Sequence, residues 1–131
     1  MVTAGVLGAS GYSGGEVLRL LAGHGGIEVR KAWANASAGQ PLSALHPHLA
    51  SLADLQVAAF DASDADVDIV FMALPHGQSA QYAQQLSCLV VDLGADHRLT
   101  DSGAWQRYYG GEHAGTWTYG LPELTGARAK I

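Results

Sequence analysis

Three glycines spaced three residues apart, Gly8, Gly11 and Gly14, constrain this chain more than any other feature of its sequence. They follow a short apolar run at 3–7 and precede a segment at 15–22 whose apolar residues recur at the period of a helix. Glycine lets the backbone turn tightly and approach a bulky anion, and the helix that leaves the turn presents unpaired N–H groups to that anion. The segment therefore predicts a strand–turn–helix unit that binds a pyrophosphate, with an ordinary strand-to-helix turn as the alternative.

The rest of the sequence alternates between short apolar runs and helical segments. Runs that predict strands lie at 3–7, 27–33, 69–74 and 89–93, with a weak one at 55–59, and helices are expected at 15–22, 78–86 and 101–108. Gly23 is expected to end the first helix and Thr100 to cap the last. Residues 35–52 predict a long loop with at most one short helix, and residues 110–131 show little periodicity. This alternation predicts an α/β fold of the Rossmann type. Residues 1–131 would form one NAD(P)-binding domain: a doubly wound, mostly parallel sheet with helices on both faces.

The composition excludes several classes of protein. Of the 131 residues, 48% are hydrophobic and 15% are charged, which is typical of a globular domain. The net charge of -5 argues against nucleic-acid binding, and no apolar run approaches the roughly 18 residues that a membrane span needs. Cys88 is the single cysteine, which excludes an internal disulfide, and no secretory leader is expected. We therefore expect a cytoplasmic protein.

The residues after the second expected strand indicate which dinucleotide the turn binds. An NAD-binding domain usually has an acid there, which binds the ribose 2′-hydroxyl. Residues 33–37 contain no acid, and we expect Asn35 and Ser37 to donate hydrogen bonds to a 2′-phosphate. NADP is therefore the predicted cofactor, the alternative being a loop that does not contact it. In the turn itself the expected contacts are the three glycines together with Ser10, Tyr12 and Ser13.

The loop after the apolar run at 69–74 is expected at the same edge of the sheet as the glycine turn, because the carboxyl ends of parallel strands meet there. Its cofactor-binding residues would be Leu74, Pro75, His76 and Gly77, with Pro75 and Gly77 shaping a wall for the ribose or nicotinamide. His76 is a candidate general acid, and a structural or solvent-facing histidine is the alternative.

The loop after the apolar run at 89–93 should reach this edge too. Arg98 in that loop could bind a phosphate or a carboxylate through two parallel hydrogen bonds. The alternative is a structural ion pair between Arg98 and either Asp92 or Asp96.

Two groups of potentially reactive side chains are interpreted as structural. Cys88 begins an expected strand, at the end of the sheet opposite the cofactor, and is interpreted as a small buried hydrophobic residue. His46 and His48 have neither a cysteine nor a third clustered histidine beside them, so no metal site is expected.

Five segments together resemble the N-acetyl-gamma-glutamyl-phosphate reductases, a family within the semialdehyde dehydrogenase superfamily. They cover the chain almost from end to end, in the order found in the family. They are GASGYSGGEVLRLL from Gly8, SAGQPLSALHPHL from Ser37, ALPHGQSA from Ala73, VVDLGADHRL from Val90 and TYGLPEL from Thr118. The resemblance implies a homo-oligomeric enzyme of arginine biosynthesis that uses NADPH to reduce a small acyl phosphate to a semialdehyde. It also implies that Arg98 binds the substrate phosphate.

The resemblance further implies a catalytic cysteine that attacks the acyl phosphate and a histidine that serves as acid and base. In the family both lie beyond the position of Ile131, so these residues alone are expected to bind cofactor without reducing substrate. Two departures from the family pattern are His97, where Phe is common, and Trp33, where a small polar residue is common. The alternatives are a stand-alone nucleotide-sensing module and the paralogous amino-adipate phosphate reductase of lysine biosynthesis.

Overall fold

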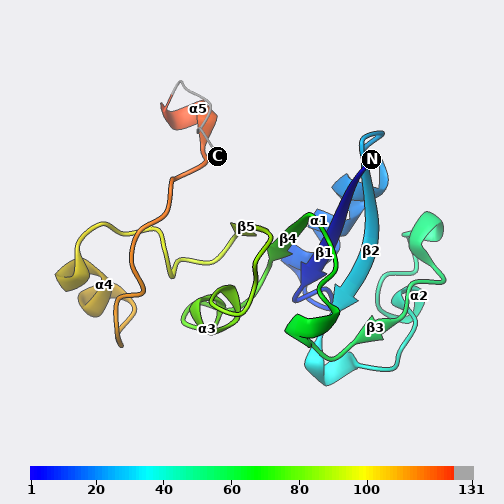
Figure 1. The fold of residues 1–131 in the computed structure, drawn as a ribbon, viewed down its shortest axis with the longest axis horizontal. Helices are drawn as coiled ribbons and strands as arrows, with labels where there is room; N and C mark the ends of the chain where they lie inside the picture. The colour runs from blue at the N-terminus through cyan, green and yellow to red at the C-terminus, as the bar shows by residue number, and fades with distance from the viewer. Residues whose placement is uncertain (126–131) are drawn as a thin grey trace.

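A computed structural model describes residues 1–125 and contains one sheet of five parallel strands (Figure 1). The strands are β1 (Val2–Leu7), β2 (Ile27–Trp33), β3 (Val57–Ala58), β4 (Ile69–Met72) and β5 (Leu89–Asp92), in the order β3-β2-β1-β4-β5. The helices are α1 (Tyr12–Ala22), α2 (Leu42–Leu45), α3 (Ser79–Ala83), α4 (Ser102–Tyr108) and α5 (Pro122–Thr125). The expected doubly wound α/β fold is confirmed, and every strand pairing is parallel.

The strand order reverses at β1, and this reversal decides where a ligand can bind. From β1 the chain moves outward to β2 and β3, and then returns to place β4 and β5 on the other side of β1. The loops after β1 and β4 therefore leave the sheet side by side, and the Ala73 N–H donates to the Leu7 carbonyl at 2.8 Å. In open α/β sheets, ligands bind in the crevice that such a reversal creates at the carboxyl ends of the strands.

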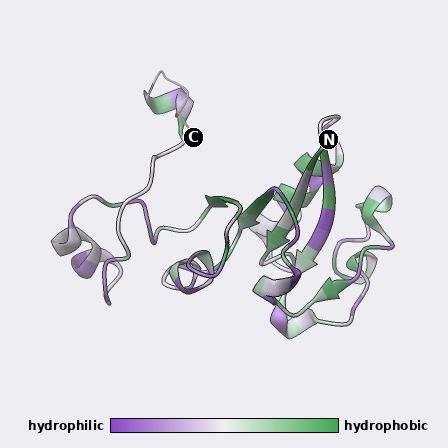
Figure 2. Ribbon diagram, in the orientation of Figure 1, coloured by the Kyte–Doolittle hydropathy of each residue, from purple (hydrophilic) through white to green (hydrophobic). Residues whose placement is uncertain are grey.

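Apolar side chains alternate between the two faces of the sheet, and each face has its own core. The hydrophobic residues of β4 and β5 stand out in green in Figure 2. On one face α1 packs against alanines of β1 and β2, whose small side chains let the helix approach closely. On the other face lie β4 side chains and partly buried residues of α3. The first core contains Ala4, Val6, Val17, Leu18, Leu21, Ala32 and Leu42, and the second contains Leu7, Trp33, Val67, Val70 and Met72.

Trp33 fills the second core and explains why β1 contains a glycine. The indole is fully buried, and a Cβ added at Gly5 would lie 2.6 Å from its Cη2 atom. The edge of Phe60 meets the ring at a centroid distance of 5.5 Å. The unusual tryptophan therefore packs in the core, and its side chain does not line the cleft described below.

Several expected elements differ in extent from those observed. The first helix begins at Tyr12, before the expected start at residue 15, because the glycine turn itself adopts the first helical turn. The weak strand at 55–59 shortens to two residues, and the helix expected over 78–86 is Ser79–Ala83. The cap of α4 is Asp101 and not Thr100, since the Asp101 carboxylate accepts the N–H groups of Gly103 and Ala104.

The chain after β5 forms an arm that extends away from the sheet (Figure 1). The arm contains α4, which was expected at 101–108, and α5, which lies in the segment at 110–131 where the sequence shows little periodicity. His97 and Trp117 stack face to face with ring centroids 3.7 Å apart, and the Trp117 N–H donates to the His97 carbonyl at 2.9 Å. Residues 126–131, the end of the expected domain, lie outside the described residues. Within 1–125 no helix is long and apolar enough to span a membrane.

Candidate dinucleotide site at the glycine turn

The glycine turn is folded so tightly that two of its glycines cannot carry a side chain. Gly8 has a φ of +88°, and a Cβ there would overlap the carbonyl oxygen of Ala73 in the neighbouring loop. A Cβ at Gly14 would overlap the carbonyl of Gly8, because the first turn of α1 lies directly on the residue that follows β1. These two glycines are therefore required by the fold itself, whatever the turn binds.

Gly11 differs from them, because the space around it is open. Its nearest neighbour to an added Cβ is the Gly8 carbonyl oxygen at 3.7 Å, an ordinary contact. Gly11 is the N-cap of α1 and its backbone is extended, with no side chain that caps the helix. The first N–H groups of a helix have no partner within it, and they carry the positive end of the helix dipole. This end of α1 can therefore bind an anion that approaches over Gly11.

No negative charge on the first turn of α1 would repel an anion that approaches over Gly11. The first turn contains no acidic residue. Glu16, one turn further on, is paired with Arg19 at 2.7 Å, and the hydrogen bond from Arg19 lowers the pKa of the Glu16 carboxyl. Both side chains are more than half exposed, so this pair does not act on the turn as an isolated charge.

A cleft of about 370 Å³ lies between the glycine turn, the end of β2 and the loop after β4. Of the residues expected to bind cofactor, Gly8, Ser10, Gly11, Asn35, Leu74 and Pro75 line it. The others, Tyr12, Ser13, Gly14, Ser37, His76 and Gly77, do not. Leu7, Ala34, Ala36, Ala73, Gln78 and Tyr82 line it as well. The sequence signal for Gln78 and Tyr82 was their place in the helix that follows the Pro75 loop.

Asn35 forms the wall of this cleft at the end of β2. Its Oδ1 accepts the N–H of Phe60 at 2.9 Å, and its Nδ2 donates to the hydroxyl oxygen of Tyr82 at 3.4 Å. The amide thereby ties together the ends of β2 and β3 and helix α3. The Tyr82 hydroxyl accepts this hydrogen bond, so its own proton remains available to a group inside the cleft.

The loop after β4 is held by a buried carboxylate that sequence analysis assigned only to a possible ion pair. Asp96 is 1% exposed, and its two oxygens accept the N–H groups of Gly77 at 2.6 Å and Ala80 at 3.1 Å. Gly77 has a φ of +86°, so the carboxylate fixes a turn that favours glycine. His76 faces the other way: its Nδ1 accepts the Ala95 N–H at 3.1 Å, and its ring meets Tyr109 edge-on.

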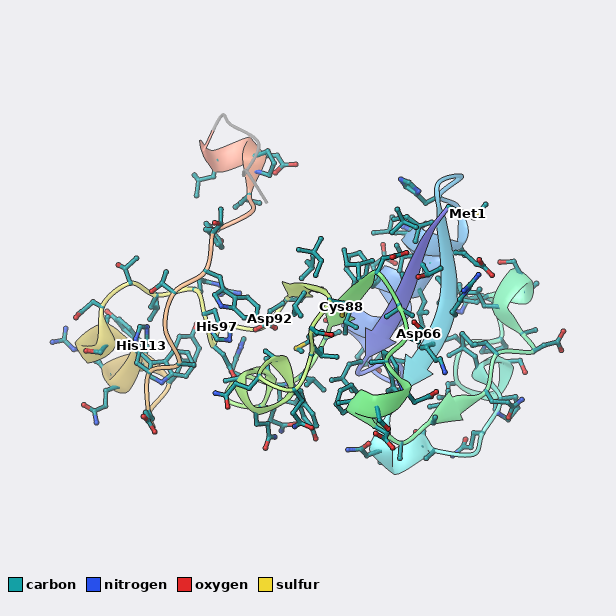
Figure 3. The ribbon with its side chains drawn as sticks, viewed as in Figure 1. Met1, Asp66, Cys88, Asp92, His97 and His113 are labelled. Carbon is teal, nitrogen blue, oxygen red and sulfur yellow. The ribbon has the colours of Figure 1, made fainter. Side chains whose placement is uncertain are left out.

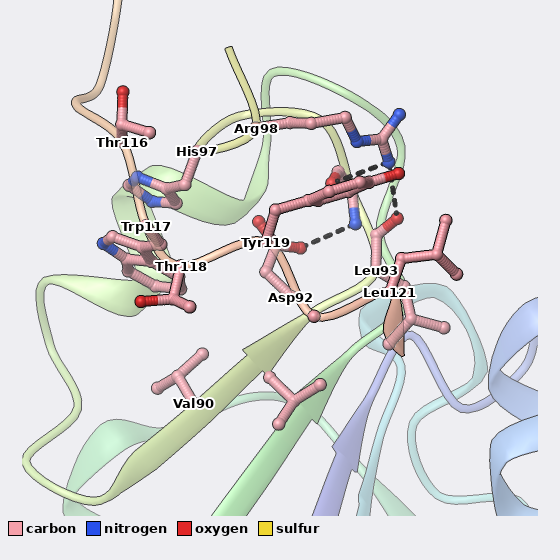
Figure 4. A pocket seen from close by; sticks show the side chains of 13 residues that line it. Val90, Asp92, Leu93, His97, Arg98, Thr116, Trp117, Thr118, Tyr119 and Leu121 are labelled. Atoms are coloured by element: carbon pink, nitrogen blue, oxygen red, sulfur yellow. Dashed lines mark hydrogen bonds between the residues drawn. The ribbon is translucent and has the colours of Figure 1, made fainter. Parts of the chain in front are cut away.

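A second cavity of about 850 Å³ lies beyond β5, between its carboxyl end and residues 116–121 of the arm (Figure 4). Arg98 lines it and donates to the carbonyl of Gly94 at 3.2 Å. The ion pair that was the alternative for Arg98 is not formed among residues 1–125. Asp92 binds the hydroxyl of Ser79 through Oδ1, whereas its buried Oδ2 has no partner in the described part of the chain. The exposed Arg98 guanidinium can therefore receive an anionic group from this cavity.

Cys88 directly precedes β5, and Asp92 ends that strand (Figure 3). Asp92 also lines the second cavity. The thiol is partly buried and packs against the second core, so it is less buried than the sequence predicts. Because β5 is an edge strand, one of its sides lacks a neighbouring strand to cover the residue. Burial still raises the pKa of the Cys88 thiol, which disfavours the reactive thiolate. In 1–125 no group of three potential metal ligands gathers.

Comparison with known proteins adds a family and a set of relatives. The profile of the family described as "Semialdehyde dehydrogenase, NAD binding domain" matches residues 3–131. The chain is 62% identical to an N-acetyl-gamma-glutamyl-phosphate reductase of Acidothermus cellulolyticus, over 96% of this chain and 38% of that protein. It is 56% identical to the protein of that name from Streptomyces coelicolor, over 99% of this chain and 39% of the relative. The chain thus spans about two fifths of the length of these relatives.

Among solved structures, the fold is similar to that of aspartate semialdehyde dehydrogenase with NADP from Candida albicans. The TM-score is 0.61 at 21% sequence identity, and the match covers 76% of this chain and 32% of the other. At this identity the likeness concerns the fold.

Proposed function

Because this chain belongs to the NAD-binding domain family of the semialdehyde dehydrogenases, we propose that its glycine-turn cleft binds NADP(H). The observation that carries the proposal is the uncapped start of α1, open over Gly11, at the point where the strand order reverses. A pyrophosphate fits there because it supplies negative charge and acceptor oxygens to unpaired N–H groups. We further propose that residues 1–131 form a single domain around this cleft.

The preference for NADP over NAD rests on the chemistry at the end of β2. A carboxylate there would bind the 2′-hydroxyl of NAD and repel a 2′-phosphate. The cleft instead presents Ala34, Asn35 and Ala36 on this side, with the Tyr82 hydroxyl facing them. The Asn35 amide and the Tyr82 hydroxyl are uncharged donors, so they can donate hydrogen bonds to a phosphate without repelling it. Ser37 lies close by in the chain and remains a proposed donor, as do the N–H groups of Tyr12 and Ser13.

For the whole protein we propose the activity that the names of its relatives state, the reduction of N-acetyl-gamma-glutamyl phosphate. The family resemblance implies that the product is the semialdehyde and that the reaction belongs to arginine biosynthesis. When bound, NADPH supplies the hydride. Arg98 would bind the substrate phosphate, since its guanidinium is exposed in the second cavity at the same edge of the sheet. His76 and Gly77, in the loop after β4, remain proposed cofactor contacts.

Cys88 has no place in this mechanism, because it directly precedes β5, at the opposite end of the strand from Asp92, and lines neither cavity. The catalytic cysteine and histidine are therefore sought beyond residue 131 of the full-length protein. We also propose a cytoplasmic location, in keeping with the single cysteine of residues 1–131. That the full-length protein is a homo-oligomer is proposed from the family resemblance.

The test is a pair of fluorescence titrations of the full-length protein with NADPH and with NADH. We expect saturable binding of both, with NADPH the tighter ligand. Absence of binding by either dinucleotide would overturn the proposal. Assays of the same protein with N-acetyl-gamma-glutamyl phosphate and with the amino-adipate analogue then distinguish the two reductases, and inactivity with both would favour a nucleotide-sensing role.

A further inference from the structure

His46 is a buried histidine that the proposed chemistry does not use, and it contacts the glycine turn from below. It follows α2 and is 9% exposed, and its Nε2 lies 2.7 Å from the carbonyl oxygen of Ala9. A carbonyl only accepts hydrogen bonds, so Nε2 carries the proton and donates. The ring also packs on α1, since a Cβ added at Gly15 would lie 2.5 Å from its Cε1.

The hydrogen bond from His46 completes the fixation of Ala9. Ala9 is fully buried, and its N–H already donates to the Trp33 carbonyl at 3.0 Å. Both polar backbone groups of this residue are therefore held, one by the end of β2 and the other by a side chain 37 residues further along the chain. Without His46 the Ala9 carbonyl would be buried and unpaired, which proteins avoid.

The hydrogen bond from His46 also determines the orientation of the Ala9–Ser10 peptide, which borders the cleft. The carbonyl of Ala9 and the N–H of Ser10 belong to the same trans peptide, so they point in opposite directions. A donor that holds the carbonyl on the α2 side directs the Ser10 N–H away from α2. Ser10 lines the cleft, and its N–H has no hydrogen-bond partner elsewhere in residues 1–125.

We propose that His46 is a positioning residue for the pyrophosphate: it orients the Ala9–Ser10 peptide so that the Ser10 N–H points at the bound anion. This inference rests on the proposed dinucleotide function. It also explains why a second glycine follows Gly14 in α1. Gly14 makes room for the Gly8 carbonyl, and Gly15 makes room for the imidazole of His46.

Two variants of the full-length protein and two ligands test the proposal. His46→Leu removes the N–H donor at similar volume, whereas His46→Gln retains an N–H donor at a similar distance from the backbone. NADPH contains the pyrophosphate, and adenosine 2′-monophosphate lacks it but keeps the adenosine and the 2′-phosphate. Affinities come from fluorescence or calorimetric titration, and a melting curve for each variant verifies that it is folded at the assay temperature.

We expect His46→Leu to weaken NADPH binding by about tenfold or more, because one hydrogen bond to a charged group is lost. Binding of adenosine 2′-monophosphate should change by less than about twofold, and His46→Gln should restore most of the NADPH affinity. Equal losses for both ligands would mean a general loosening and would overturn the proposal, as would wild-type NADPH affinity in His46→Leu. Failure of the wild-type protein to bind NADPH would refute the proposed function instead.

If His46→Leu does not fold, His46→Asn replaces it, since its shorter amide cannot reach Ala9 but remains polar. The same selective loss for NADPH is then expected. A His46→Asn protein with unchanged affinity for both ligands would contradict the positioning role.

Discussion

Replacing Gly11 by valine should remove dinucleotide binding and leave the fold intact. The Gly11 backbone is extended, with a φ of -83° and a ψ of 173°, a conformation that valine adopts readily. An added Cβ meets nothing closer than the Gly8 carbonyl oxygen at 3.7 Å, so no clash within the protein is expected. The remaining penalty is the poorer helix cap, about 1 kcal/mol, which corresponds to a fall of no more than about 2–4 °C in the melting temperature of the longer full-length protein.

The effect on binding should be much larger than the effect on stability. A valine side chain at the start of α1 occupies the space through which an anion approaches the N–H groups of the first turn. Hydrogen bonds to charged groups contribute about 1.5–3 kcal/mol each. Loss of two of them amounts to about 3–6 kcal/mol, so NADPH affinity should fall by at least about 100-fold at 1.4 kcal/mol for each factor of ten.

Two other glycines provide the controls. Gly8→Ala, unlike Gly11→Val, should destabilise the fold by roughly 2–5 kcal/mol. The reason is the positive φ of Gly8 and the overlap of an added Cβ with the Ala73 carbonyl. Gly25→Val places the same side chain in open space in the turn before β2, at the opposite edge of the sheet, and should affect neither property. The assay combines thermal unfolding with NADPH titration of the full-length protein. NADPH affinity within threefold of wild type in folded Gly11→Val would refute the placement of the pyrophosphate.

Three further substitutions or measurements test other parts of the structure. In Asn35→Asp, one carboxylate oxygen still accepts the Phe60 N–H and the other can accept a hydrogen bond from the Tyr82 hydroxyl. The added negative charge should lower the affinity for NADPH relative to that for NADH by about tenfold in parallel titrations. An unchanged ratio of the two affinities would place the 2′-phosphate elsewhere. Gly5→Ala should lower the free energy of unfolding by about 1–3 kcal/mol, measured in urea, since the new methyl group collides with the Trp33 ring; wild-type stability would contradict that packing. Cys88 has a raised pKa, so at pH 8 it should react with Ellman's reagent more slowly in the folded than in the urea-unfolded protein, and the difference should shrink as the pH rises; equal rates at pH 8 would show that the thiol is not protected.

The sequence predicted the features that depend on neighbouring residues. The glycine spacing, the apolar runs and Pro75 placed the turn, the strands and the loop after β4, because strand and turn preferences act over a few residues. Local patterns still left some choices open. Thr100 and Asp101 are both good caps, and only the structure shows that Asp101 accepts hydrogen bonds from the N–H groups of α4.

What the sequence did not predict depends on contacts between distant segments. His46 reaches Ala9 from 37 residues away, and Asp96 binds the N–H of Gly77 from 19 residues away. Neither a histidine nor an aspartate in the sequence indicates such a distant partner, and a histidine beside a proline is equally compatible with a surface loop. The alternative expected for Arg98 was an ion pair with a neighbouring aspartate. Asp96 is instead oriented toward the loop after β4, and the guanidinium of Arg98 donates to backbone carbonyls.

The carbonyl of Trp33 accepts the N–H groups of both Gly8 and Ala9, and the carbonyl of Leu7 accepts that of Ala73. These bonds join the ends of three strands before any ligand arrives, so the conformational entropy of ordering the turn is lost during folding and not during binding. A ligand that meets such a preorganised site keeps more of its interaction free energy as affinity. In hydrogen exchange, the amides of Gly8 and Ala9 should therefore be protected in the free protein, whereas that of Ser10 should become protected only when the dinucleotide is bound.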